Sequence, residues 1–218
     1  MSLINLITGK ISNQIAENAE NKFGISKNQM IALLAVAAPL IISHLRNKSH
    51  DDKEAEALNN ALDKDHNGSI LNDASQPEAR LTEGGSILDH IFGGQKSAVE
   101  SHLSENTGIS IDKIGPSLAM LTPVVMGYIG QQKQQNDAGA NGLGNLLGGI
   151  LEDASAKAQA EESHPLNDIL KSVLGNVEHS QPSGNPLSDI LGNVLGGGNQ
   201  QQSGGGLGSI LANIFGSK

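Results

Sequence analysis

The chain has 218 residues, enough for one ordinary domain with a tail or for two small domains. It carries 14 basic and 23 acidic side chains, and the net charge of −9 argues against nucleic acid or an anionic membrane surface as partner, because both need a basic face. Aromatic residues make up 2% of the chain and cysteine is absent, which excludes disulfides, thiolate nucleophiles and cysteine-ligated zinc and predicts an aliphatic core.

The first ten residues lack the basic-then-apolar layout of a signal peptide. The longest apolar run, residues 30–42, is shorter than a membrane-spanning helix. We therefore expect a cytoplasmic protein without a membrane span.

Residues 11–23 are predicted to form an amphipathic helix. Apolar side chains recur there at every fourth position, which places them on one helical face. Gly24 is a natural stop, because glycine adopts the left-handed conformation cheaply. Ser26 with Gln29 then matches a capping box and starts a second helix.

That second helix, residues 26–46, is apolar almost all round and belongs inside a bundle. A similar stretch follows at an offset of 84, residues 110–130, in which Leu118 corresponds to Leu34 and Pro123 to Pro39. We expect each proline to kink its helix, because proline lacks the N–H that bonds the carbonyl four residues earlier. The pattern predicts an all-α fold: a pseudo-two-fold helical bundle from an internal duplication, over residues 1–132 with repeat halves 11–48 and 95–132.

The segment between the halves contains the one stretch with metal-site spacing. A short helix is expected over residues 54–62, and the run from 63 to 70 then matches the first eight places of a calcium loop, with oxygen ligands at Asp63, Asp65 and Asn67. The twelfth place, however, holds Ala74 in place of the bidentate glutamate. The alternative is a helix stop at Asn67-Gly68 followed by a cap at Ser69.

The remaining segment before the second half is expected to be a loop over residues 74–85, a short segment 87–92 capped by Ser86, and an amphipathic helix over 95–106. The seven histidines are scattered through the chain without a nucleophile and carboxylate at a convincing spacing. We expect them to be solvated or to cap helices. No Walker A loop, G-x-S-x-G elbow or H-E-x-x-H motif is present, so we do not expect an enzyme.

From residue 133 to 218 the chain is a Gly/Gln/Asn-rich tail. It contains four Leu/Ile repeats that start near residues 143, 166, 187 and 207, each with apolar side chains at i, i+3, i+4, i+7 and i+8. Each copy predicts a short amphipathic helix, and Gly-rich linkers join the copies. Helices this short are marginal alone in water, so the stripes need cover from the protein itself or a partner, or else form transiently; a membrane is the least favoured cover. The predicted interaction residues are Leu166, Ile169, Leu170, Leu187, Ile190, Leu191, Leu207, Ile210 and Leu211.

Several stretches resemble one bacterial family. The Leu3-Ile-Asn-Leu-Ile7 start, the Gly24-Ile-Ser26 entry, the 65–71 and 85–93 segments and the Leu121-Thr-Pro-Val-Val-Met-Gly127 stretch are similar to the domain-of-unknown-function 937 family, and more distantly to YidB-like proteins. The resemblance covers roughly residues 1–151. It implies an all-α bacterial domain with no assigned activity and no catalytic residues to carry over.

We therefore expect a non-catalytic bacterial scaffold or interaction protein that forms homo-oligomers through its amphipathic repeats. The alternative is a cation-binding regulatory module that uses the 63–70 loop. No cofactor is expected apart from a possible calcium ion in that loop, and the expected partner is a second copy of the chain or another protein.

Overall fold

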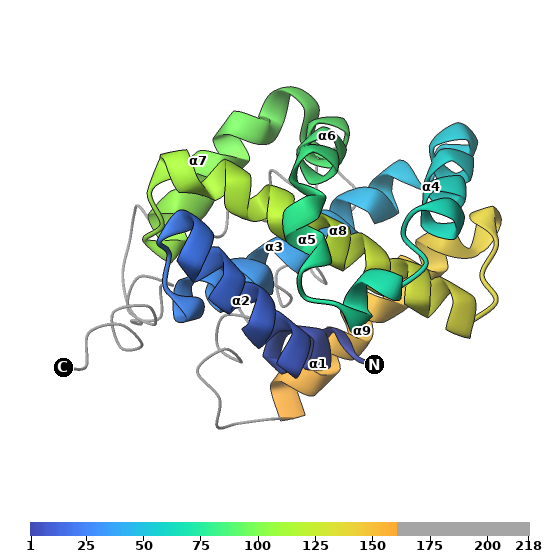
Figure 1. Cartoon of the computed structure of the whole chain (residues 1–218). Helices are drawn as coiled ribbons and strands as arrows, with labels where there is room; N and C mark the ends of the chain where they lie inside the picture. Colours follow the sequence, from blue (N-terminus) through green and yellow to red (C-terminus); the bar gives the residue numbers. More distant parts are fainter. Residues whose placement is uncertain (161–218) are drawn as a thin grey trace, which may run out of the picture.

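The computed structural model of the protein describes residues 1–160, which form helices and short 3₁₀ turns without any strand (Figure 1). The all-α prediction is confirmed. The α-helices are α1 (Leu3–Thr8), α2 (Lys10–Phe23), α3 (Lys27–Lys48), α4 (Asp52–Lys64), α5 (Gln76–Ala79), α6 (Leu81–Phe92), α7 (Lys96–Thr107), α8 (Ile111–Gln135) and α9 (Leu143–Ala160). The 3₁₀ turns are η1 (Ser69–Asn72), η2 (Gly93–Gln95) and η3 (Ala140–Gly142).

Helices α3 and α8 form the interior of the fold, with the other helices around them (Figure 1). Their side chains are buried along most of their length, and both Leu34 and Leu118 are 1% exposed. The predicted capping box is present at the start of α3, where the Gln29 N–H donates to Ser26 Oγ and the Ser26 N–H donates to Gln29 Oε1 at 3.1 Å. The two prolines of the repeat lie within these continuous helices.

The turns that lead into α3 and α8 contact each other reciprocally. Gly24 and Gly108 end α2 and α7 with positive φ angles of 62° and 66°. Gln29 Nε2 donates to the Gly108 carbonyl at 3.0 Å, and Lys113 Nζ donates to the Gly24 carbonyl at 3.1 Å. Gln29 and Lys113 correspond at the offset of 84, as do the two glycines, so each half contacts the other half's turn at the same position. A two-fold axis requires this pattern. The origin of the halves by duplication stays a prediction.

The segment around α6 differs from the prediction. The expected loop over residues 74–85 instead contains α5 and the start of α6, so Ser86 lies within a helix and does not cap one. The reason is packing: Gly84 lies so close to α8 that a Cβ atom there would be 1.9 Å from the carbonyl oxygen of Ala119. Glycine in this helix permits close approach of two backbones, whereas the sequence pattern favoured a break.

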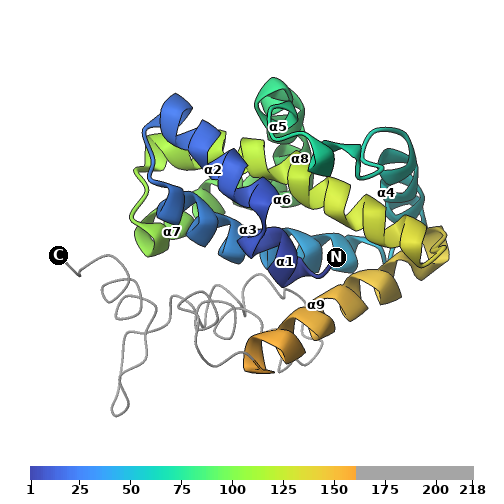
Figure 2. The same cartoon turned by 60° about the horizontal axis from the view of Figure 1, so that its bottom comes forward.

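The first tail repeat forms α9, which starts at Leu143 and packs against α1 and α3 (Figure 2). Its apolar stripe is covered, and Leu143, Leu147, Ile150 and Leu151 are each 5% exposed or less. The packed body therefore extends past the predicted domain boundary at residue 132. The repeats that start near 166, 187 and 207 lie outside the described residues.

Helix α3 is long and apolar enough to cross a membrane by length and composition, and so is the bent pair of Leu81–Thr107 and Ile111–Gln135 if it is counted as one span. In α3, however, 72% of the apolar window is buried inside the fold. A buried core helix passes such a test as readily as a membrane span does, so the result carries little weight.

Candidate functional site

The predicted cation ligands lie where α4 ends, and two of them are already engaged. Asp63 pairs with the ammonium of Lys133 from α8 and accepts from Asn59 Nδ2 at 3.2 Å. Asn67 Oδ1 accepts from the Ser69 N–H at 3.1 Å and so closes a local turn. Among residues 1–160, no three His, Asp or Glu side chains are arranged to hold a metal ion. The loop is therefore held together by its own hydrogen bonds and one ion pair.

The turn at Gly68 explains this local structure. Its φ of 94° suits glycine, and η1 starts directly after it at Ser69. Helix α4 ends at Lys64, two residues after the predicted end at residue 62 and before the Asn67-Gly68 stop of the alternative interpretation. Residues 65–68 then cross α8 closely, and a Cβ at Gly130 would lie 1.8 Å from the carbonyl oxygen of His66. This contact brings His66 into the interior.

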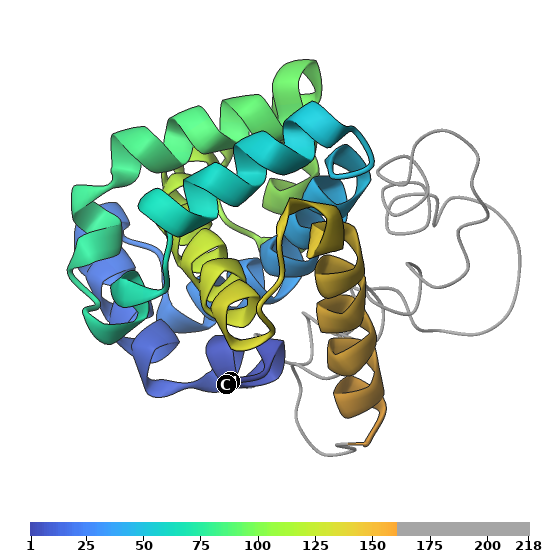
Figure 3. The same ribbon diagram turned by 90° about the vertical axis from the view of Figure 1, so that its right-hand side faces the viewer.

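A cavity of about 370 Å³ lies between α4 and α6, and the C-terminal end of α3 and Met126 of α8 complete its lining. Figure 3 shows α4 and α6 running beside each other on this side of the molecule. Its lining is mostly aliphatic and comes from these four helices and from His66; the larger part is made by Leu45, Leu58, Ala61, Ile87, Ile91 and Met126. We call it the α4–α6 cavity. Pockets of a few hundred cubic ångströms with apolar walls are typical of small-molecule sites.

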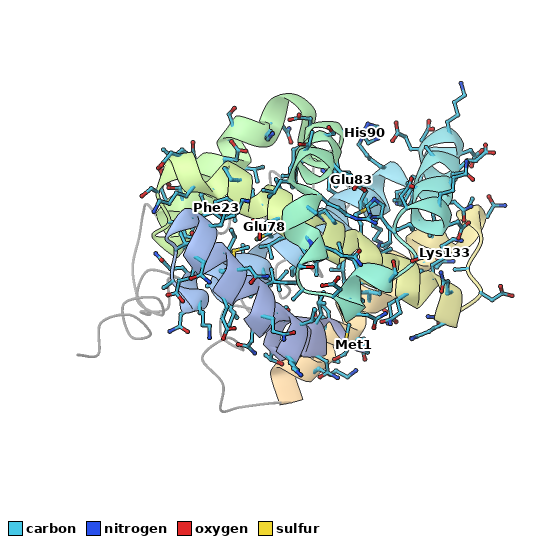
Figure 4. The ribbon with its side chains drawn as sticks, viewed as in Figure 1. Met1, Phe23, Glu78, Glu83, His90 and Lys133 are labelled. Carbon is cyan, nitrogen blue, oxygen red and sulfur yellow. The ribbon has the colours of Figure 1, made fainter. Side chains whose placement is uncertain are left out.

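Two histidine–glutamate pairs line the α4–α6 cavity. His66 Nε2 lies 3.2 Å from Glu83 Oε1, and His90 Nε2 lies 3.2 Å from Glu54 Oε2. Glu83 and His90 project from α6 on the side of α4 (Figure 4). They are seven residues apart, which is two helical turns or about 10 Å. The two pairs therefore lie at opposite ends of the apolar lining of the cavity.

A lysine, Lys48, also contacts the His90–Glu54 pair. Lys48 Nζ lies 3.5 Å from Glu54 Oε2 and donates to the His90 carbonyl at 3.0 Å. Side chains from α3, α4 and α6 are thus tied together at this end of the cavity. All three side chains are partly or largely exposed, so the pairs add little to stability.

His66 differs from the expectation of solvated or capping histidines, because its side chain is 4% exposed. Burial lowers the pKa of His66 below its ordinary value, outweighing the opposite effect of the Glu83 carboxylate. The neutral ring carries its proton on Nε2, which faces the Glu83 acceptor, and Nδ1 presents a lone pair. Within residues 1–160 this buried Nδ1 has no hydrogen-bond partner. The Nδ1 atom itself is covered by protein atoms.

A second candidate surface is the α9 interface, meaning the apolar stripe of α9 and the surfaces of α1 and α3 that cover it. Two glycines of α9 lie against polar side chains at and just after the end of α3. A Cβ at Gly148 would lie 3.3 Å from the Arg46 guanidinium carbon, and one at Gly144 would lie 3.2 Å from Ser49 Oγ. The interface thus accepts an aliphatic stripe flanked by small residues.

Sequence reasoning found the α9 stripe and missed the α4–α6 cavity. His66 and Glu83 are 17 positions apart in the chain, and Glu54 and His90 are 36 positions apart. A local sequence pattern cannot predict pairs at such separations. The predicted interaction residues from Leu166 to Leu211 lie outside the described residues, and α9 is the one repeat of that series whose packing the structure describes.

Comparison with known proteins gives one match. The family model for bacterial proteins of unknown function DUF937 matches residues 5–132, which is more than half of the chain. No curated protein and no solved structure matches it. The geometry described above is therefore the main guide to function.

Proposed function

Because the chain belongs to the bacterial DUF937 family, whose function is unknown, we propose from its own residues that it is a non-catalytic interaction protein that self-associates. The later tail repeats of one chain would bind the α9 interface of another. The observation that carries the proposal is the burial of the first repeat: α9 is covered along its stripe by α1 and α3. The other repeats share the same apolar spacing.

Exchange between repeats needs little free energy, because one stripe replaces another of the same pattern. A short helix of this kind is marginal in water and gains its stability from docking. When an identical or near-identical element is exchanged between chains, the packing that is broken within one chain re-forms between two chains, as in domain swapping. The tail offers three further copies for one interface, so chains can be linked without a new binding surface.

The three later repeats are not equally suited to the interface. The positions of Gly144 and Gly148 correspond to Gly208 and Ala212 in the last repeat, which are small. In the repeat that starts near 187 they correspond to Ser188 and Gly192, which are also small.

The repeat that starts near 166 differs. There the same positions hold Asn167 and Lys171, and the lysine would face the guanidinium of Arg46. A large side chain and a like charge disfavour this copy. We therefore expect the last two repeats to bind the α9 interface and the repeat near 166 to act as a spacer.

Light scattering after size-exclusion chromatography tests the proposal. The full chain should show a mass that rises with concentration, whereas residues 1–160, which keep α9, should remain monomeric. In the full chain, Ile190→Asp combined with Ile210→Asp places charges in two stripes and should abolish association.

Ile169→Asp is the matched control, because it places the same charge in the repeat that does not fit. It should leave the mass unchanged. Monomeric full chain at every concentration would refute self-association, and equal effects of Ile169→Asp and the double variant would refute the selection by small residues.

A further inference from the structure

We propose that Asn67 is a modification site, at which the fold promotes spontaneous loss of the side-chain amide through attack by the Gly68 backbone nitrogen. Asn67-Gly68 is one of two Asn-Gly pairs in the chain, and the other is Asn141-Gly142. Asparagine is a thermally labile residue, and a following glycine, which has no Cβ atom, leaves the approach to its backbone nitrogen open. The modification does not depend on the proposed self-association.

The reaction needs only the chain and water. The Gly68 nitrogen forms a bond to Asn67 Cγ and loses its proton to solvent, while the bond from Cγ to Nδ2 breaks and Nδ2 takes up a proton and leaves as ammonia. Water then opens the resulting succinimide ring. Addition of water at Cγ gives aspartate, whereas addition at the main-chain carbonyl carbon gives isoaspartate, in which the backbone runs through Cγ and gains a methylene group.

The hydrogen bonds around Asn67 favour this attack. Asn67 Oδ1 accepts from the Ser69 N–H at 3.1 Å, and the ring that this bond closes contains both atoms that must join, Asn67 Cγ and the Gly68 nitrogen. Negative charge develops on Oδ1 as Cγ is attacked, and an N–H already directed at that oxygen stabilises the charge. Within residues 1–160 the Gly68 N–H donates no hydrogen bond, so the attacking nitrogen is not held elsewhere. Asn67 is exposed, so water reaches the ring.

Asn141-Gly142 presents the same dipeptide in an unreactive setting. Asn141 is exposed as well, but it lies within the 3₁₀ turn η3. The Gly142 N–H donates to the Gly139 carbonyl at 2.9 Å, so this hydrogen bond has to break before the nitrogen can attack. The chain therefore contains its own matched control.

Isoaspartate at position 67 should disrupt the crossing of residues 65–68 and α8. A Cβ at Gly130 would lie 3.4 Å from Asn67 Cα and 1.8 Å from the His66 carbonyl oxygen, so the main chain has no room for an added methylene group. We expect the 66–70 segment to separate from α8. Aspartate keeps the original backbone and an oxygen acceptor for the Ser69 N–H, so it should leave the crossing in place.

Incubation of the full chain at mildly alkaline pH, followed by peptide mapping with mass spectrometry, tests the site. In the folded chain, deamidation should be about tenfold faster at Asn67 than at Asn141. In urea both pairs lose their surroundings, and the two rates should agree within about threefold. Equal rates in the folded chain, or a faster reaction at Asn141, would overturn the proposal.

Hydrogen exchange then tests the consequence for the 66–70 segment. The isoaspartate fraction of the aged chain should exchange faster than fresh protein over these residues, because a segment released from α8 loses its protection. Asn67→Asp, measured without ageing, is the matched control for the added charge and should exchange like fresh wild type. Asn67→Gln removes the reactive pair and should show no time-dependent change. An isoaspartate fraction that exchanges like fresh protein would show that the crossing tolerates the longer backbone and would contradict the expected release.

Discussion

Gly84→Ala and Gly85→Ala should change the stability of the fold in opposite directions, although the two glycines are neighbours within α6. A Cβ at Gly84 would lie 1.9 Å from the carbonyl oxygen of Ala119 and 3.1 Å from Pro123 Cδ, so α6 and α8 must move apart to admit it. Overpacking of this kind costs about 1–3 kcal/mol or more. At Gly85 a Cβ meets no atom of the described residues within 4 Å, and alanine should stabilise the helix by about 1 kcal/mol.

Thermal and urea denaturation followed by circular dichroism measure both changes. For a body of this size a change of about 1 kcal/mol moves the melting temperature by about 2–4 °C, so the two variants should lie on either side of the wild type. If Gly84→Ala were as stable as the wild type, α6 would not approach α8 as closely as described. If both variants lost stability equally, both glycines would be needed for a backbone conformation, and the close approach of Gly84 to α8 would not be the cause.

Leu147→Ala should lower the free energy of unfolding by about 2–5 kcal/mol, because the Leu147 side chain is fully buried in the α9 interface. Leu146→Ala should lower it by about 1 kcal/mol, because that side chain is only half-buried. Chemical denaturation measures both changes, and a larger loss for Leu146→Ala would show that the other face of α9 packs against α3. Gly130→Ala places a Cβ 1.8 Å from the His66 carbonyl oxygen and should lower the free energy of unfolding by about 1–3 kcal/mol. Gly139→Ala, whose Cβ would meet no described atom within 4 Å, should change it by about 0.5 kcal/mol or less. Equal melting temperatures for the two variants would contradict the close crossing of residues 65–68 and α8. Burial lowers the pKa of His66 in the folded protein, so the unfolded chain binds that proton more tightly. The stability that the neutral ring contributes is therefore complete above the unfolded pKa of 6.5 and declines as the pH falls below that value. His66→Phe should flatten the dependence of unfolding free energy on pH between about pH 7 and pH 5.5, and an unchanged slope would assign the proton uptake to another group.

The sequence predicts the two interior helices well because their signals are local. The Gly-Ile-Ser entry, the capping box at Ser26 and an apolar run without a polar face depend on neighbours three or four positions away. A helix that is apolar all round has to lie in the interior, whatever surrounds it. The same reasoning located α9, because its stripe begins at Leu143 with the helical spacing intact.

Two features depend on packing between distant segments and could not be predicted. Gly84-Gly85 favours a loop by propensity, and the close packing of α6 on α8 overrides that preference. The α4–α6 cavity arises from the spacing of four helices, and the sequence contains no sign that His66 would be buried opposite Glu83. Histidine is exposed or buried according to its tertiary surroundings, which periodicity does not report.

The two halves differ at positions that decide what each interior helix can contact. Ser43 and Arg46 of α3 correspond at the offset of 84 to Gly127 and Gly130 of α8. A Cβ at Gly127 would lie 2.4 Å from Ile70 Cγ2, so these glycines admit the 66–70 segment directly onto the helix backbone.

On α3 the corresponding residue is Arg46, whose guanidinium lies against Gly148 of α9. Helix α8 thus contacts a loop through its backbone, and α3 contacts α9 through a side chain. The close backbone crossing leaves little freedom and fixes the position of His66, whereas the end of a flexible side chain can adjust to its neighbour. The two interior helices, which match at an offset of 84, therefore make different contacts: α8 packs against a loop at two glycines, and α3 contacts α9 through the side chain of Arg46.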